Sequence, residues 1–385
     1  MSFSKSKGII PYNETNDKEY SAEDISSYKV LHVGQLLENR LQAWNGMFAS
    51  SKIEGCVSPD YSVFNPIGNQ VNVDYYAYLF RTDLYIEQWA NASKGVGAGF
   101  NRLYTPQFGS IYSLFPPRNE QDAIVSYLDE KMAKIDAAIA QQQKMIDLLN
   151  ERKQIIINRA VTKGLNPNAK MKDSGVEWIG EVPEGWEIVT LKRLAGGFSN
   201  GTSLSQLSNG ETPYRVSRIE TISSGRINYD KTGFVKYDST LPKYKMALND
   251  ILISNINSFE RIGNSAIYNG EESLYHGMNL LRIKPNTDVV PQYLITYLKS
   301  SLFSLQMKLA CKPAVNQVSV PSSSVKNMLV VLPSISEQHK LVDYCFSKIE
   351  EIEVAIKGAN NQISLLQERK QIIINEVVTG KVKVM

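Results

Sequence analysis

The stretch EQDAIVSYLDEKMAKIDAAIAQQQKMIDLLNERKQIIINRAVT, residues 120–162, recurs as EQHKLVDYCFSKIEEIEVAIKGANNQISLLQERKQIIINEVVT, residues 337–379. The two copies align without a gap at an offset of 217 residues, and 21 of 43 positions are identical. Each copy follows a proline-bearing strand end, IYSLFPPRNEQ in the first half and MLVVLPSISEQ in the second. Chance does not produce such a repeat, so we expect both halves of the chain to end in the same structure.

Both copies predict long helices with a heptad seam, because apolar residues recur at alternating steps of four and three. The predicted pairing residues are Leu128, Met132, Ile135, Ile139, Ile146, Leu149 and Ile156 in the first copy, and Ile349, Ile352, Ile356, Ile363, Leu366 and Ile373 in the second. Lys153 and Lys370 occupy the same seam position, where a polar residue costs stability and fixes register and partner. A single amphipathic helix cannot bury its stripe alone. We therefore predict that the two helices pair with each other rather than stand as separate exposed arms.

The segments around the helices show short strand patterns with Gly, Asn and Ser turns, which are typical of mixed, strand-rich domains. The predicted class is α+β with an internal pseudo-twofold repeat. Its predicted parts are a first globular domain (1–116), a first helical spacer (117–163), a linker (164–172), a second globular domain (173–332) and a second spacer (333–385).

Weak similarity continues upstream of the helices, where SSYKVLHVGQLLENR (26–40) aligns with LPKYKMALNDILISN (241–255) at an offset of 216. Projecting back, Met1 corresponds to about Ser217. The first half therefore has no counterpart of roughly the first 45 residues of the second, which begins near Met171.

Composition sets the broad class. The 385 residues suffice for two domains. The 42 Lys and Arg against 39 Asp and Glu give a net charge of only +3, so any basic surface must be local. The three cysteines form no CxxC pair, which argues against a disulfide framework or a zinc ribbon. The start of the chain has no signal-peptide pattern, and no long apolar run occurs, so we expect a soluble cytoplasmic protein.

Several motifs together resemble the specificity subunits of Type I restriction-modification systems. KDSGVEWIGEVPEGWEIVTLKRLA (172–195) resembles the opening of a target-recognition domain of that family. ILISNINSFERIGNSAIY (251–268) and QLLENRLQAWNGMFASSKIEGCVSPDYSVFNP (35–66) resemble its internal strand motifs, and LPSISEQ and LLxERKQIIIN resemble its helical spacers. The resemblance implies two target-recognition domains that each read half of a split DNA site. It also implies antiparallel spacers that set the distance between the half-sites and dock methyltransferase subunits.

The chain departs from this family in its first recognition domain. The EWIGEIP-like opening occurs only once, at Glu177–Pro183. Three explanations are open: a truncated gene, a wrongly assigned start codon, or a shortened half whose fold is completed by another chain.

Catalytic motifs are missing from the sequence. It contains no NPPF or DPPY tetrapeptide, no glycine-rich AdoMet loop after a strand and no GxxxxGK[ST] phosphate loop. The three histidines lack metal-ligand spacing. We therefore predict a protein that is not an enzyme and binds no cofactor or metal. By the resemblance, AdoMet belongs to a partner methyltransferase subunit, and ATP and Mg²⁺ belong to a partner restriction subunit.

DNA reading requires cations for phosphates and Arg, Asn or Gln side chains for base edges. Candidates in the second domain are Arg215, Ser217, Arg218, Asn255, Asn257, Arg261, Asn264, Lys312, Asn316 and Gln317, and those in the first are Lys5, Lys7, Asn39, Arg40, Gln42, Lys94 and Arg102. The leading hypothesis is a specificity subunit for double-stranded DNA that directs methyltransferase and restriction subunits. The alternatives are a subunit of a related system with methylation and cleavage fused in one partner, an inactive or regulatory remnant that only docks a methyltransferase, and a purely structural coiled-coil protein.

Overall fold

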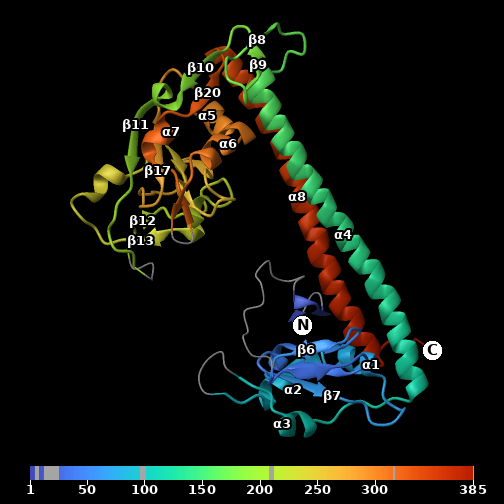
Figure 1. The fold of residues 1–385 in the computed structure, drawn as a ribbon. Helices are drawn as coiled ribbons and strands as arrows, with labels where there is room; N and C mark the ends of the chain where they lie inside the picture. Colours follow the sequence, from blue (N-terminus) through green and yellow to red (C-terminus); the bar gives the residue numbers. More distant parts are fainter. Residues whose placement is uncertain (5–7, 13–25, 96–100, 208–211, 315–316, 385) are drawn as a thin grey trace. The chain divides into compact units, whose positions relative to one another are not determined.

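The computed structural model describes residues 1–4, 8–12, 26–95, 101–207, 212–314 and 317–384 (Figure 1). Its contacts divide the chain into two compact units. Unit 1 consists of residues 1–144 and 358–385, and unit 2 of residues 145–357. Each unit contains one globular domain and parts of two long helices, α4 (Arg118–Lys163) and α8 (Ile335–Val378).

The domain of unit 1 is built on a three-stranded antiparallel sheet of order β5-β4-β7. Its elements are β1 (Ser2–Ser4), β2 (Gly8–Ile10), β3 (Lys29–Leu31), β4 (Leu36–Asn39), β5 (Phe48–Ser50), β6 (Gly55–Val57), β7 (Tyr61–Phe64), α1 (Val73–Leu79), α2 (Asp83–Ala92) and α3 (Thr105–Gly109). An aromatic core around Phe48, Phe80 and Trp89 joins the sheet to α1 and α2. The same core takes in the start of α4 and the end of α8, so the domain and the helices are packed as one unit.

The domain of unit 2 is built on a four-stranded sheet of order β11-β17-β14-β16. Its strands are β8 (Met171–Asp173), β9 (Glu181–Pro183), β10 (Glu187–Thr190), β11 (Ala195–Asn200), β12 (Arg215–Val216), β13 (Gly233–Phe234), β14 (Ile251–Ile253), β15 (Ile256–Asn257), β16 (Ser265–Ile267), β17 (Leu281–Pro285), β18 (Lys312–Ala314), β19 (Gln317–Ser319) and β20 (Leu329–Leu332). Its short helices are α5 (Pro291–Leu298), α6 (Ser301–Leu309) and α7 (Ser322–Lys326).

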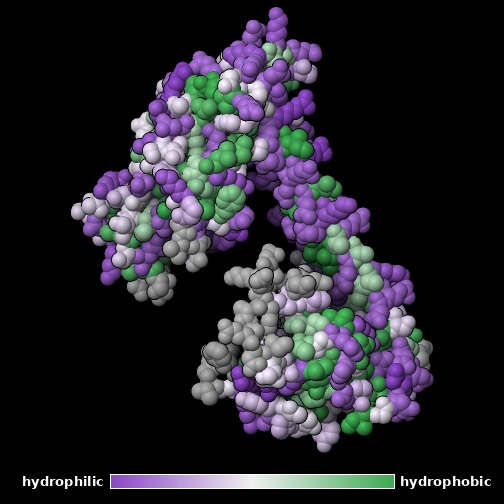
Figure 2. Space-filling model, in the orientation of Figure 1, coloured by the Kyte–Doolittle hydropathy of each residue, from purple (hydrophilic) through white to green (hydrophobic). Residues whose placement is uncertain are grey.

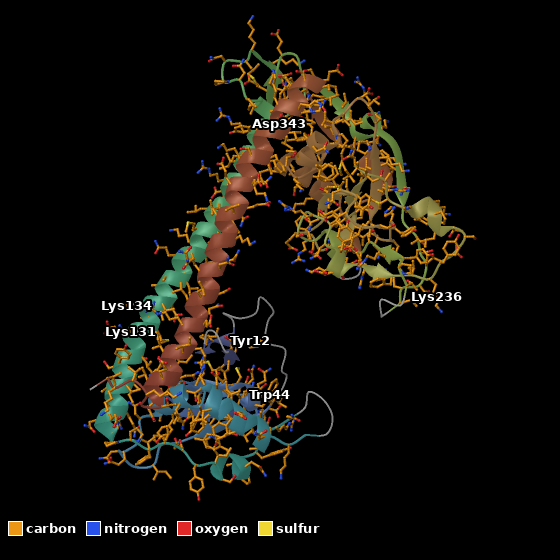
Figure 3. The ribbon with its side chains drawn as sticks, turned by 180° about the vertical axis from the view of Figure 1, so that it is seen from behind. Tyr12, Trp44, Lys131, Lys134, Lys236 and Asp343 are labelled. Atoms are coloured by element: carbon orange, nitrogen blue, oxygen red, sulfur yellow. The ribbon has the colours of Figure 1, made fainter. Side chains whose placement is uncertain are left out.

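The long helices pair in antiparallel fashion within each unit. In unit 1 the start of α4 packs with the end of α8, and in unit 2 the end of α4 packs with the start of α8. All 13 predicted seam residues are buried or half-buried, whereas their neighbours Leu148 and Leu365 are 56% and 58% exposed. Outside the seam the helices carry mainly hydrophilic side chains (Figure 2), including Lys131 and Lys134 on the outer side of α4 (Figure 3).

The two seam lysines explain the register of the helices. Lys153 Nζ lies 2.8 Å from Glu353 Oε1 in unit 2, and Lys370 Nζ lies 2.7 Å from Asp136 Oδ1 in unit 1. Adding the repeat offset of 217 to 153 and 136 gives 370 and 353. The two ion pairs therefore join equivalent positions of the repeat. Each lysine therefore has a specific acidic partner on the opposite helix, which favours this register over others.

Reversing one of these charges is expected to destabilise unit 1. Lys370→Glu places a carboxylate against Asp136 and should lower the free energy of unfolding by about 1 kcal/mol, because the pair is partly exposed. Adding Asp136→Lys should restore at least half of that loss. Urea denaturation measures both effects, with Lys357→Glu on the exposed face of α8 as the control. Equal losses in the double variant and in Lys370→Glu would contradict a paired contact.

The identical residues of the repeat attach the helices to the domains. Asn158 Oδ1 accepts from Ser301 N at 2.8 Å at the start of α6, and its repeat equivalent Asn375 accepts from Asp83 N at 3.3 Å at the start of α2. The backbone N–H groups at the start of a helix have no partner within the helix, so these amides act as caps from another element. The two spacers share the QIIIN motif because its asparagine caps the start of a domain helix in each unit.

At the start of each long helix, a buried glutamine also accepts a backbone hydrogen bond from the domain. Gln121 Oε1 accepts from Asn72 N at 2.8 Å, and Gln338 Oε1 accepts from Val290 N at 2.7 Å. Both glutamines are fully buried, and Asn72 and Val290 are the residues that precede α1 and α5. The pseudo-twofold repeat thus extends from the helices into the domains.

The structure corrects one detail of the upstream alignment. Gly34 and Asn249 share a positive φ, of 83° and 70°, and donate equivalent backbone hydrogen bonds to Ser51 and Tyr268. Their offset is 215, one residue less than the sequence alignment gives. The structure agrees with the correspondence of Met1 to Ser217. Met1 N donates to Cys56 O at 2.8 Å, and Ser217 N donates to Tyr275 O at 2.8 Å.

Candidate nucleic-acid interface

The buried titratable groups do not assemble a catalytic centre. Burial lowers the pKa of His276 to about 4, and this fully buried ring contacts Leu280 O at 3.0 Å. Burial raises the pKa of Glu38 to about 7 at a position equivalent to the core residue Ile253. No three His, Cys, Asp or Glu side chains of the described segments are grouped so that they could hold a metal ion. Nor does any described helix have the length and apolar character needed to cross a membrane.

Four of the candidate DNA-reading residues meet in one cavity of unit 2. This cavity has a volume of about 560 Å³, and Arg218, Asn257, Arg261 and Gln317 are among its lining residues. The small sheet β15-β19-β18 brings two of them together, because Asn257 on β15 pairs with Val318, the neighbour of Gln317 on β19. Arg218 comes from the loop after β12, and Arg261 comes from the turn after β15.

These four side chains differ in how many hydrogen bonds and ion pairs they form within the domain. Arg261 and Gln317 are exposed, and neither side chain has a hydrogen-bond or ion-pair partner in the described part of the chain. Arg218 forms a loose ion pair with Glu220 at 3.5 Å. Asn257 Nδ2 donates to Ser254 Oγ at 3.0 Å, and its Oδ1 accepts from Ser258 N at 2.8 Å. Arg261 and Gln317 therefore have the greatest unused capacity for base edges and phosphates.

The other six residues that line this cavity were not among the sequence candidates. Ser223 and Lys231 line it from the loops between β12 and β13, and Lys231 adds a third cation. Glu220 and Asp230 also line the cavity, so its three cations and two carboxylates leave a net charge of +1. No sequence pattern marks these four positions, because loop folding alone brings them beside Arg261.

Other candidates of the second domain lie outside this cavity. Arg215 donates to Tyr229 O and forms an ion pair with Glu272 at 3.0 Å. Ser217 is fully buried and accepts from Gly277 N at 3.0 Å, and Asn255 donates to Val320 O at 3.2 Å. The side chains of Arg215, Ser217 and Asn255 therefore hold the domain together.

The remaining candidates of this domain are scattered. Asn264 lines a separate cavity of about 510 Å³ beside α4, together with Lys299, whose pKa burial lowers to about 8. Lys312 is exposed on β18, and Asn316 lies outside the described residues.

The candidates of the first domain do not gather in one cavity of the described residues. Arg40 donates to Pro59 O and Asp60 O, Arg102 lies 3.6 Å from Asp60, and Asn39 Oδ1 accepts from Leu41 N, so these side chains stabilise turns. Gln42 and Lys94 are exposed. Lys5 and Lys7 lie outside the described residues.

Comparison with known proteins identifies a family and several relatives. Residues 183–364 match the family described as Type I restriction modification DNA specificity domain. A putative type I restriction enzyme MjaX specificity subunit of Methanocaldococcus jannaschii is 35% identical over 205 residues, which are 52% of this chain and 47% of the relative. The type I restriction enzyme EcoKI specificity subunit of Escherichia coli is 22% identical over 316 residues, 80% of this chain and 65% of the relative.

One solved structure supports the fold along most of the chain. It is a chain from the work "Structural basis underlying complex assembly and conformational transition of the type I R-M system", with a TM-score of 0.68 and 16% identity. The match covers 94% of this chain and 85% of that one.

The fold match and the family match show a chain that resembles Type I specificity subunits and contains one matched specificity domain. Residues 183–364 belong to the Type I restriction modification DNA specificity domain family, and the matched regions of the chain span 47% and 65% of the lengths of the two relatives above.

Proposed function

We propose that this protein reads a two-part DNA target and directs a methyltransferase and a restriction subunit to it. The observation that carries the proposal is the convergence of Arg218, Arg261, Asn257 and Gln317 on one cavity of a specificity domain. Guanidinium groups bind guanine edges and phosphates, and amide side chains form paired hydrogen bonds with adenine. A protein with a net charge of only +3 needs such a local group to hold DNA.

The proposal assigns no chemical step to this chain. AdoMet is expected on the methyltransferase subunit, and ATP with Mg²⁺ on the restriction subunit. The helices α4 and α8 supply the docking surface for the methyltransferase, because they carry exposed apolar side chains such as Leu148, Phe346 and Leu365 among mainly hydrophilic ones. Since its target is cellular DNA, we place the protein in the cytoplasm.

The internal repeat supports a split target. Each unit attaches one domain to the helices through the same asparagine and glutamine contacts, so the two domains are attached alike. Two readers on one face of a duplex contact half-sites about 10 base pairs apart. We therefore expect a target of two short blocks separated by a fixed number of unspecified bases.

The test is to co-express the chain with its neighbouring methyltransferase subunit in a host without DNA methylation and to map N6-methyladenine by single-molecule sequencing. A split motif with a fixed gap is the expected result. The variant Arg261→Ala should weaken methylation. It should leave co-purification of the two subunits unchanged, which separates DNA reading from docking. Absence of any modified motif, despite co-purification, would contradict DNA reading.

A second candidate function is a regulatory subunit that docks a methyltransferase without specifying a full site. One observation favours it: the strands β10 and β11 of unit 2 have no counterpart among the described residues of unit 1. The same methylation map separates the two candidates, because a regulatory subunit would yield no split motif.

A further inference from the structure

A second cavity of unit 2, the Lys299 cavity, lies where the domain meets the two long helices. Its volume is about 510 Å³, and its lining residues include Lys153 of α4, Glu353 of α8, Arg226 from the loop between β12 and β13, and Lys299 between α5 and α6. Lys153 Nζ lies 2.8 Å from one carboxylate oxygen of Glu353, and Arg226 forms an ion pair with the other. Glu353 is therefore fully engaged, and its two ion pairs tie the domain to the helices.

Lys299 is the third cation of this cavity and takes no part in that tie. Its ammonium group forms no hydrogen bond or ion pair with the described part of the chain. Part of the side chain is exposed, but burial of the remainder, together with the charges of Lys153 and Arg226, lowers its pKa to about 8. Glu353 acts in the opposite direction. Since Glu260 also lines the cavity, three cations and two carboxylates leave a net charge of +1, which favours an anion.

A buried serine lies beside Lys299. A Cβ on Gly225 would lie 3.6 Å from Lys299 Nζ and 3.9 Å from Ser265 O, so both residues flank the same glycine. Ser265 lines the cavity and is 3% exposed, and its Oγ has no hydrogen-bond partner in the described segments. A buried hydroxyl without a partner is costly, and a bound acceptor would remove that cost. An ammonium and a hydroxyl are both donors to phosphate oxygens.

The Lys299 cavity adjoins the cavity that holds the candidate DNA-reading residues. Ser223 lines both cavities, and the turn after β15 contributes Arg261 to the first and Glu260 and Ile262 to the second. A duplex carries one phosphate charge per about 1.7 Å of its axis. A duplex whose base edges reach the first cavity therefore has backbone phosphates close to the second.

Unit 1 carries a basic residue at the position equivalent to Lys299. Gln154 Nε2 donates to Lys299 O at 2.9 Å, and its repeat equivalent Gln371 donates to Arg81 O at 3.1 Å. Arg81 lies between α1 and α2 as Lys299 lies between α5 and α6. The two side chains differ in shape but share a positive charge, which is expected of a contact with an anion.

We propose that the Lys299 cavity binds a phosphate group of the DNA backbone through the Lys299 ammonium and the Ser265 hydroxyl. This inference rests on the proposed function, because it adds a backbone contact beside the residues that read bases. Phosphate contacts fix the position of a protein on a duplex without reading its sequence. Since this cavity lies between the domain and the helices, the contact fixes the duplex against both.

The test is a methylphosphonate scan of the target duplex with the assembled complex. Each duplex replaces one charged phosphate by a neutral methylphosphonate, and binding isotherms give its affinity. At one position the wild-type complex should lose about tenfold in affinity, whereas Lys299→Gln, itself about tenfold weaker on the unmodified target, should lose nothing further. The control Lys192→Gln changes an exposed lysine of unit 2 outside both cavities and should keep the full methylphosphonate effect.

The pH dependence supplies a readout that a purely structural lysine would not change. Phosphate binds the protonated amine, so this contribution to affinity is present below the Lys299 pKa of about 8 and is lost as the pH rises through it. Wild-type affinity should fall by up to about tenfold between pH 7 and pH 9. Lys299→Arg should bind well and remove that fall, because a guanidinium stays charged.

Other outcomes would overturn the proposal. Equal affinity of the wild type and Lys299→Gln, or independent losses at every methylphosphonate position, would show that Lys299 contacts no backbone phosphate, while base reading stands. If inorganic phosphate at constant ionic strength raises the Tm of the wild type but not of Lys299→Gln, and no duplex position is coupled to Lys299, the site takes free phosphate instead of DNA. A wild-type complex that binds no target contradicts the proposed function, and the absence of a Lys299-dependent Tm shift with phosphate then overturns the site as well.

Discussion

Replacing both Arg218 and Arg261 by alanine is expected to lower the affinity of the protein for its target DNA about 100-fold. A guanidinium contact to a base edge contributes about 1–3 kcal/mol, and two contacts near the lower end of this range, about 1.4 kcal/mol or tenfold each, correspond to this factor. Both side chains line the same cavity of unit 2, and Arg261 is exposed without a partner in the described part of the chain. Removing them should leave the fold intact, because neither is buried.

The measurement is a salt series of binding isotherms with the assembled complex and its target. The slope of log K against log salt should decrease by about 1 for each phosphate contact that is lost. The control variant Lys236→Ala, Arg193→Ala removes two exposed cations of unit 2 that lie outside the cavity. An equal loss of affinity in both double variants would mean that overall charge, rather than this cavity, binds the DNA.

The helical part of the fold could be predicted from the sequence because it depends on spacing. Steps of four and three place apolar side chains on one face whatever surrounds them, and all 13 predicted seam residues are buried or half-buried. The repeated lysine indicated a specific partner. Spacing alone could not identify Asp136 and Glu353, because each helix carries several acidic residues.

The candidate site was predictable only in part, since it depends on how loops fold. Arg215 and Arg261 look alike in the sequence, each in a short polar stretch. The first forms an ion pair inside the domain with Glu272, and the second is exposed at the cavity. Lys231 joins the cavity from the end of a short 3-10 helix, Tyr229–Lys231, that carries no recognisable motif.

Trp186→Ala is expected to lower the free energy of unfolding of unit 2 by about 3–5 kcal/mol. This is the usual cost of removing a buried tryptophan, because apolar contacts are lost and a cavity is left behind. Here the variant also removes the hydrogen bond to Glu337. Urea denaturation measures the loss, with Trp44→Ala as the control, since that ring is 40% exposed and should cost far less.

Unit 1 indicates how the loss should be distributed within unit 2. The described residues of unit 1 form the β5-β4-β7 sheet, the helices α1, α2 and α3 and an aromatic core, without a tryptophan at the pocket equivalent to that of Trp186. Trp186→Ala should therefore release β10 from β20 while β14 and β17 stay paired, which leaves unit 2 with the same open face as unit 1. Hydrogen exchange should show lost protection for amides of residues 187–190 and 329–332 and retained protection for 251–253. Uniform loss of protection across the domain would instead show that the tryptophan supports the entire core, and the two units would then differ in more than one segment.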